Sequence, residues 1–185
     1  SIQHYLAMFS DISTLKAQQE QLEYVAHYDA LTRLPNRVLL ADRLHQAMAQ
    51  ALRYRQILAV AYLDLDGFKA VNDTYGHETG DQLLIETARR LVQAVRDSDT
   101  VARLGGDEFA VILPMIGGRA EVEEVARRVV AALAQPFALS GGEARISASV
   151  GVAIYPEHGA DLEHIRASAD AALYAVKAAG RNGYR

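Results

Sequence analysis

Two adjacent glycines between short apolar runs constrain the fold of this chain more than any other feature. The Gly-Gly pair at 105–106 separates the run 100–104 from the run 109–113. This pattern is typical of a β-hairpin with Gly-Gly at its tip. Asp107 and Glu108 follow the turn directly. A turn without side chains admits close approach to the backbone, and carboxylates are ligands for Mg²⁺, so the hairpin is either a phosphate and metal site or a solvated turn.

The bulk composition narrows the class of protein. The chain has 185 residues, 50% of them apolar and 23% charged, enough for one globular domain plus an appendage. A net charge of −4 offers no basic face, so neither nucleic acid nor a membrane is expected as a partner. The absence of cysteine excludes disulfides and cysteine-based sites. Without a secretory signal or membrane-spanning run, we expect a cytoplasmic protein whose parent could be anchored elsewhere.

The first 28 residues are predicted to form a separate segment. Residues 5–9 are apolar and compatible with a strand, and the next two residues can cap a following helix. Positions in that helix spaced alternately by three and four are Ile12, Leu15, Gln19, Leu22 and Ala26. This spacing favours a short dimeric coiled coil, and an amphipathic helix lying on its own domain is the alternative.

The main domain is predicted to run from residue 29 to 185. Pro35 disfavours helix at Leu34, and Asn36 can cap a new helix. A turn is expected between Gly76 and Gly80. The predicted strands are 58–63, 100–104, 109–113, 137–139 and 144–154, and the predicted helices are 37–55, 68–73, 81–96, 118–135 and 162–179. This order, with its hairpin, predicts an α+β fold in which helices pack on an antiparallel or mixed sheet.

Several polar residues lie at the ends of these elements, where ligand sites are common. Asp64 ends a buried strand and could bind a metal with Asp107 if their strands are neighbours. Lys69, Lys177 and Arg181 supply positive charge for phosphates. For each residue alone, solvated surface is the more common role.

Two further residues could recognise a base. Asp81 can accept hydrogen bonds from N1–H and the N2 amino group of guanine, and Asn72 can complement other ring atoms. Adenine lacks those donors, so this pair would favour guanine.

Five separated motifs resemble the GGDEF family, the diguanylate cyclases. They occupy 29–37, 64–73, 76–81, 103–109 and, in the last helix and after it, 169–174 with 177–182. Their order matches the family, so the chain is identified as a member. The resemblance implies a cyclase-like palm, with a central, mostly antiparallel sheet flanked by helices and an N-terminal signalling helix.

The resemblance also implies an activity. Two GTP molecules would condense into cyclic di-GMP with release of two pyrophosphates, in a homodimer that holds one GTP per domain. Asp64, Asp107 and Glu108 would be catalytic, and with the Leu65 carbonyl would hold two Mg²⁺ per active site, or Mn²⁺. Glu108 would deprotonate the attacking 3′-hydroxyl or bind the second metal. The residues implied to bind GTP are Phe68, Lys69, Asn72, Asp81, Gly105, Gly106, Lys177 and Arg181.

A product-inhibition site is implied by the Arg-x-x-Asp pair of Arg96 and Asp99. Arg103 would assist, and Arg127 or Arg128 of a neighbouring domain would complete the clamp on cyclic di-GMP. The alternative is a helix-terminal arginine with Asp99 as a local turn acceptor.

The chain departs from the family at Arg33, where glycine is frequent, and at Val176, where alanine is usual. Residues 5–13 resemble the last strand of a PAS domain and its exit into a signalling helix, which implies a preceding sensor. The sequence is also similar to proteins in which an EAL phosphodiesterase domain follows.

Two functions other than synthesis stay open. One is a GTP-binding regulatory domain that controls an attached phosphodiesterase, and the other is a cyclic di-GMP receptor that uses only Arg96 and Asp99. The intact Glu108 favours synthesis.

Overall fold

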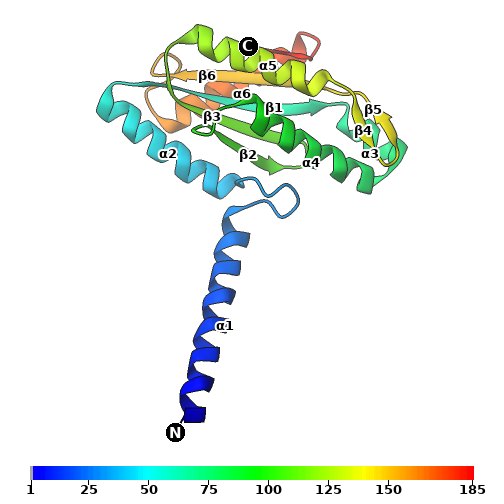
Figure 1. The fold of residues 1–185 in the computed structure, drawn as a ribbon. Helices are drawn as coiled ribbons and strands as arrows, with labels where there is room; N and C mark the ends of the chain where they lie inside the picture. The colour runs from blue at the N-terminus through cyan, green and yellow to red at the C-terminus, as the bar shows by residue number, and fades with distance from the viewer. Residues whose placement is uncertain (1) are drawn as a thin grey trace.

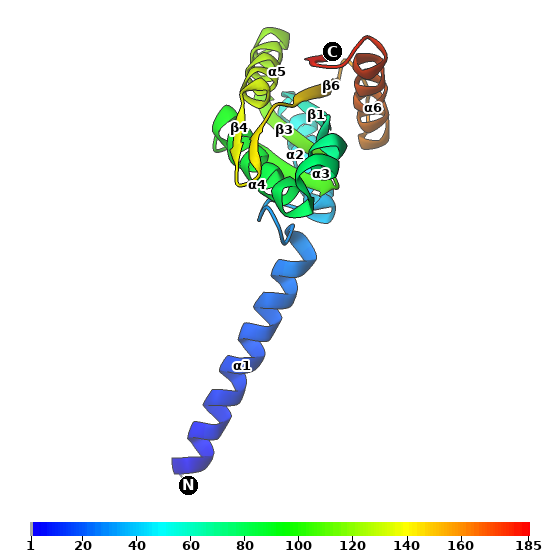
Figure 2. The same ribbon diagram turned by 90° about the vertical axis from the view of Figure 1, so that its right-hand side faces the viewer.

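A computed structural model describes the backbone of residues 2–185 and the side chains of residues 12–185. The predicted α+β fold is confirmed: a central, mostly antiparallel sheet carries helices on both faces. Figure 1 shows α1 projecting from the domain, and Figure 2 shows α5 and α6 on opposite sides of the sheet. The helices are α1 Ile2–His27, α2 Arg37–Tyr54, α3 Phe68–Tyr75, α4 His77–Ala94, α5 Arg119–Ala134 and α6 Leu162–Ala178.

The main sheet has five strands in the order β2-β3-β1-β6-β7, with β1 at its centre. Only β6 and β7 run parallel among these neighbours. A second, two-stranded sheet pairs β4 with β5. The strands are β1 Ile57–Asp66, β2 Thr100–Gly105, β3 Glu108–Ile116, β4 Phe137–Leu139, β5 Gly142–Ala144, β6 Ser147–Tyr155 and β7 Gly183–Tyr184.

The glycine hairpin forms as predicted. Strands β2 and β3 pair antiparallel, and Gly105 and Gly106 make the tip with φ values of +133° and +49°. Residues with side chains rarely adopt this backbone, which explains why glycine occupies both positions.

Alternation along β1 divides the core between the two faces of the sheet. Ala61 and Leu63 pack in one cluster with side chains of α4 and α5, whereas Val60 and Tyr62 pack in the other with α2 and α6. Helix α6 lies very close to β6, because a Cβ on Gly151 would be 2.2 Å from a backbone nitrogen of α6. This contact fixes the helix that carries Lys177.

Three expectations about local structure are wrong. The strand expected at 5–9 lies within α1, which satisfies its backbone internally where a lone strand would find no partner. The strand expected over 144–154 is divided, because Arg145 and Ile146 lie between β5 and β6. Gly80 lies inside α4 rather than at a turn, because the break occurs at Gly76 with φ +86°.

A loop joins α1 to the domain. Asn36 caps α2 as predicted, accepting from the amides of Val38 (2.9 Å) and Leu39 (3.1 Å), and its Nδ2 donates to the Ala26 carbonyl of α1 at 2.9 Å. Arg33, where glycine was expected, has φ +64°, and its guanidinium lies 5.8 Å above the Tyr24 ring. This cation–π contact offsets part of the backbone strain.

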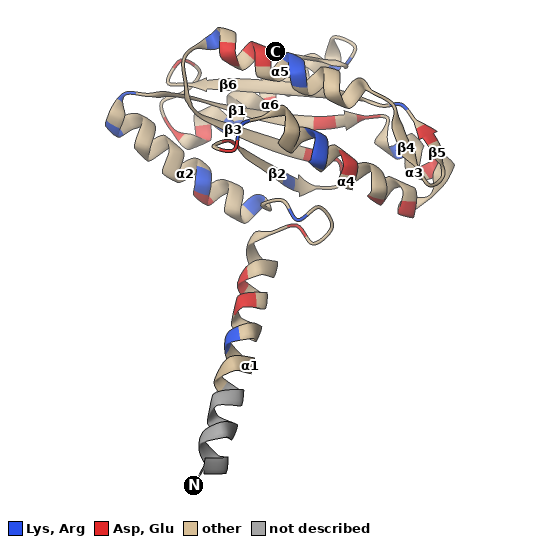
Figure 3. Cartoon of the chain, in the orientation of Figure 1, with Lys and Arg blue, Asp and Glu red and all other residues tan. Residues whose placement is uncertain are grey.

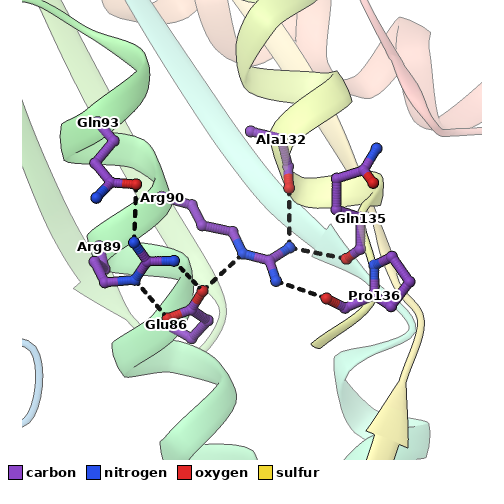
Figure 4. A network of polar contacts seen from close by, with 7 residues as sticks. All are labelled: Glu86, Arg89, Arg90, Gln93, Ala132, Gln135 and Pro136. Atoms are coloured by element: carbon purple, nitrogen blue, oxygen red, sulfur yellow. Dashed lines mark hydrogen bonds and ion pairs between the residues drawn. The ribbon is translucent and has the colours of Figure 1, made fainter. Parts of the chain in front are cut away.

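Helix α4 is joined to the end of α5 by a polar network (Figure 4). Arg90 donates to the carbonyls of Ala132 (3.0 Å), Gln135 (2.8 Å) and Pro136 (2.7 Å), and its guanidinium lies 3.7 Å from the centre of the Phe137 ring. These contacts satisfy carbonyls that the last turn of α5 leaves unpaired.

Basic and acidic residues are interspersed along the helices in the view of Figure 3. Within the described part of the chain, no helix has the length and apolar content needed to cross a membrane.

Candidate active site

The carboxylates predicted to bind metal lie together at the end of β1. Asp64 is the register partner of Glu108 across β1 and β3, and the Leu65 amide donates to the Asp107 carbonyl at 3.3 Å. The pairing of β1 with β3 therefore brings Asp64, Leu65, Asp107 and Glu108 to one place.

The electrostatics of this cluster are those of two crowded carboxylates. Burial, followed by the charge of Asp64, raises the pKa of Asp107 to about 6. Lys177, from the last turn of α6, contacts the Asp64 carboxylate through Nζ. The positive charge of Lys177 thus compensates the negative charge of Asp64. Among the described residues, the neighbouring Asp107 has no such cationic partner.

The donors present fit a hard divalent cation, which prefers carboxylate and carbonyl oxygens. Within residues 12–185, no group of three or more histidine and carboxylate side chains is arranged to hold a metal. An ion bound between Asp64 and Asp107 would therefore need further oxygens from the backbone, such as the Leu65 carbonyl, or from a ligand.

Glu108 lies at the solvent edge of the cluster. Its side chain is 54% exposed, and Arg37 approaches its Oε2 at 3.7 Å. The open side of Glu108 faces a hollow of about 220 Å³ that Arg37, Arg166 and Asp170 help to line.

The predicted base-reading residues meet at the junction of α3 and α4. The side chain of Asn72 lies directly over Gly80, where a Cβ would be 1.8 Å from Asn72 Oδ1. That buried oxygen is one of three buried side-chain N or O atoms in the described chain that find no hydrogen-bond partner. Asp81, the other residue of the predicted pair, follows Gly80 on α4 and is exposed.

The predicted phosphate-binding residues come from two sides. Phe68 and Lys69 begin α3 after Gly67, whose φ is +87°; Phe68 packs against the core and Lys69 is exposed. Gly105 and Gly106 are exposed at the hairpin tip, and Lys177 lies at Asp64. Arg181, just beyond α6, has its Nε 3.9 Å from Asp66.

At the predicted product site, the structure shows the contacts of the alternative interpretation, in which Asp99 is a local turn acceptor. The Arg96 amide donates to Asp99 Oδ2 at 2.8 Å, the local turn contact, while the Arg96 guanidinium pairs with Glu121 at 2.7 Å. Burial is the main cause that raises the pKa of Asp99. Arg128 rather than Arg127 reaches this region, donating to the Ala94 carbonyl at 2.6 Å.

Arg103 is not brought to the product site. Its guanidinium, 12% exposed, donates to both Asp29 oxygens at 3.1 Å and to the Gly106 carbonyl at 2.8 and 3.1 Å. Burial of Asp29 opposes its ionisation, but hydrogen bonds from Thr32 and Arg103 hold its pKa below the ordinary value. Arg103, on β2, thus links the hairpin tip at Gly106 to Asp29 in the loop that follows α1.

One residue missed by sequence reasoning is Asp66. It accepts hydrogen bonds from the hydroxyls of Ser147 (2.8 Å) and Ser149 (2.9 Å) and from the Asn182 amide (3.2 Å). Its alternation with Asp64 places both on one side of β1, but the sequence gives no sign of these distant partners.

Comparison with known proteins agrees with this geometry. The family model described as diguanylate cyclase, GGDEF domain, matches residues 26–183. The bifunctional diguanylate cyclase/cyclic di-GMP phosphodiesterase MucR of Pseudomonas aeruginosa is 50% identical over 93% of this chain, and the diguanylate cyclase TpbB of the same species is 40% identical over 92%. The chain spans only 25% and 40% of the lengths of these two relatives.

A solved structure extends the likeness to α1. The coiled coil and GGDEF domain of DgcB from Caulobacter crescentus, in complex with c-di-GMP, matches 99% of this chain and 97% of its own, with a TM-score of 0.88 and 32% identity. The matched family model, the identity to relatives and the fold agree, so the chain belongs to the GGDEF-domain family of diguanylate cyclases.

Proposed function

We propose that this chain condenses two GTP molecules into cyclic di-GMP and releases two pyrophosphates. The observation that carries the proposal is the cluster of Asp64, Asp107 and Glu108, built by the pairing of β1 with the glycine hairpin. Membership of the family supports it, as does the name of the relative TpbB.

The carboxylates at this cluster are suited to Mg²⁺, two per site, or to Mn²⁺. Asp64, Asp107 and the Leu65 carbonyl would hold one ion, and Glu108 is placed to join a second. When bound, the metal would neutralise phosphate charge and polarise the reacting phosphate.

The protein's own residues would bind and orient GTP. Asn72 and Asp81 would read guanine, and the bare backbone of Gly105 and Gly106 would let the phosphates pass. The triphosphate would be surrounded by Phe68 and Lys69 at the start of α3 and by Lys177 and Arg181. The three cationic side chains, Lys69, Lys177 and Arg181, would contact its outer phosphates.

The reaction needs two copies of the chain face to face. The 3′-oxygen of one GTP attacks the α-phosphorus held by the facing copy, a new P–O bond forms, and the bond to the pyrophosphate oxygen breaks. The hydroxyl proton leaves to Glu108 or, if Glu108 binds metal, to solvent. A second such step closes the ring, and catalysis rests on positioning and charge stabilisation.

Residues 1–28 would act as a signalling helix that pairs two copies, and residues 29–185 as the cyclase domain. The exposed seam side chains Ile12, Leu15 and Leu22, which are 58%, 64% and 71% exposed, support this role. The coiled coil in the matched DgcB structure supports it further. An upstream PAS-type sensor and a cytoplasmic setting belong to the same proposal.

Product would inhibit through Arg96 and Asp99, with Arg127 or Arg128 of a neighbouring domain completing the clamp. Arg128 lies beside Asp99 of its own chain, where its Nε donates to the Ala94 carbonyl, so it could also contact a product bound there. Arg103 is left out because it is occupied at Asp29 and Gly106.

The second candidate is a GTP-binding regulatory domain with little synthesis that controls an attached phosphodiesterase; the name of the relative MucR supports only the presence of a phosphodiesterase beside such a domain. Incubation with GTP and Mg²⁺, followed by mass spectrometry, separates the two. We expect cyclic di-GMP from the wild-type chain and none from Glu108→Ala, which should fold because Glu108 is exposed. A dimeric sample that binds GTP without making product would favour the regulatory role.

A further inference from the structure

We propose that Asp66 is a positioning residue that anchors the segment 180–182 and thereby aims Arg181 at the outer phosphates of a nucleotide. The phosphate part of this inference rests on the proposed function. Asp66 is 10% exposed at the point where β1, β6 and the chain leading into β7 meet. A largely buried carboxylate needs hydrogen-bond donors or a cation to offset the loss of water. The donors to Asp66 therefore show which segments it joins.

The donors to Asp66 come from two segments far apart in sequence. On β6, the hydroxyls of Ser147 and Ser149 lie 2.8 and 2.9 Å from its oxygens. On the closing segment, the Asn182 amide lies at 3.2 Å and Arg181 Nε at 3.9 Å. Asp66 is therefore hydrogen-bonded by donors of two segments, whereas Asp64 is contacted by Lys177 and lies at the proposed metal cluster.

The closing segment has a conformation that needs such an anchor. Helix α6 ends in a Schellman motif, in which the Arg181 amide donates to the Val176 carbonyl at 3.0 Å and the Gly180 amide to that of Lys177 at 3.4 Å. Arg181 and Asn182 then continue with φ values of +65° and +49°. Because side chains disfavour this region, the turn depends on contacts outside itself.

Spacing explains why two acid–base pairs can form side by side. Two residues along a strand advance about 6.6 Å, so Asp64 and Asp66 can reach two different points of the chain that ends α6. Asp64 contacts Lys177 in the last turn of the helix, and Asp66 lies 3.9 Å from Arg181 in the turn beyond it. Ser149 strengthens the junction, since it is fully buried and is the register partner of both Asp64 and Gly183.

Calorimetry with GTP and GMP tests the proposal, because only GTP has the outer phosphates. We expect Asp66→Asn to weaken GTP binding by about tenfold and to leave GMP binding within about twofold. Ser147→Ala, at a partly buried serine, should cause a smaller loss in the same direction. Asp42→Asn, at an exposed position on α2, is the matched control and should change neither affinity. Equal losses for both nucleotides, or no loss for GTP, would overturn the phosphate-aiming role.

A second measurement needs no nucleotide. Amide hydrogen exchange by NMR should be faster at Asn182 in Asp66→Asn and in Ser147→Ala, and unchanged at Leu173 within α6. Unchanged exchange at Asn182 in both variants would overturn the anchor. If the wild-type chain bound neither nucleotide, the proposed function would fail, while the exchange rates would still decide whether Asp66 holds the segment.

Discussion

Asp64 and Asp66 show how neighbouring residues of one type acquire different roles. Alternation in β1 places both on the same side, which the sequence predicts. Their partners come from Lys177 and from Ser147, Ser149 and Asn182, more than 80 positions along the chain. Spacing within a motif identifies a shared face, but tertiary contacts decide which carboxylate is available to a ligand.

At the residue scale, Gly80→Ala tests the base-reading pair. The added Cβ would overlap Asn72 Oδ1, and the Asn72 side chain would swing away. We expect GTP affinity to fall about tenfold, as for Asn72→Ala, with a stability change below about 1 kcal/mol because a flexible side chain moves.

The double variant provides the control. If Gly80 acts through Asn72, Gly80→Ala combined with Asn72→Ala should be no worse than either alone in GTP calorimetry. Additive losses would show that Gly80 acts by another route.

Arg96→Ala tests the product site at the same scale. We expect it to weaken cyclic di-GMP binding about tenfold or more, since it removes a guanidinium suited to phosphate, and to spare GTP binding. Arg127→Ala and Arg128→Ala separate the two candidate arginines, and the larger loss should occur with Arg128, which lies beside Asp99 of its own chain. Unchanged product affinity in Arg96→Ala, measured by calorimetry, would refute the site.

At the scale of elements, the contact of α4 with α5 depends on Glu86 as well as Arg90. Hydrogen bonds from Arg89 (2.6 and 2.7 Å), and then from Arg90 (2.9 Å), lower the pKa of Glu86 to about 2 against the opposing effect of burial. Because the folded chain binds this proton more weakly, the stabilisation is complete above about pH 4.5 and is lost as pH falls towards 2.

Glu86→Gln should therefore lower the free energy of unfolding by about 1 kcal/mol at pH 7. The difference from wild type should shrink in urea unfolding as pH falls from 4.5 towards 2. Glu124→Gln is the control, because Glu124 is 64% exposed and 3.9 Å from Arg128. A difference independent of pH would contradict the assigned pKa.

Element prediction succeeded where one signal dominated. The apolar run before Asp64 and the Gly-Gly tip identified β1 and the hairpin, and Asn36 identified the start of α2. Element prediction failed where the structure of a segment depends on another segment that packs or pairs with it. The two-residue β7 exists only because β6 offers an edge, and residues 5–9 are apolar enough for either a strand or a helix.

Some residues of the candidate site could likewise be predicted from the sequence, and others could not. The residues that we propose to bind metal and phosphate could all be named from the sequence, because each belongs to a motif with a chemical reason for its residue types. The roles of Asp66 and Arg103 could not be predicted in this way. They depend on contacts with Asn182 and Asp29, which are far from them in sequence. The contact of Arg128 with the end of α4 depends on which side of α5 faces α4, which the two adjacent arginines do not reveal.

At the scale of the molecule, α1 carries an apolar seam on a helix that projects from the domain (Figure 1). If α1 pairs two copies as proposed, Leu15→Glu with Leu22→Glu should give a monomer in analytical ultracentrifugation where the wild type gives a dimer, because charges at the seam oppose pairing. Ala17→Glu with Gln21→Glu, opposite the seam, should leave the dimer intact. A seam variant that stays dimeric would locate the interface elsewhere.

The most direct test of the central claim is the yield of cyclic di-GMP from GTP and Mg²⁺, measured by mass spectrometry while Glu108→Ala chains are added to wild type. If two facing copies form the site, wild type alone should give product. As Glu108→Ala chains are added, wild-type chains pair with variant chains, and the yield per wild-type chain should fall. Absence of product from a wild-type dimer would contradict cyclase activity. A yield per wild-type chain that stayed constant in excess Glu108→Ala would contradict a site shared between two copies.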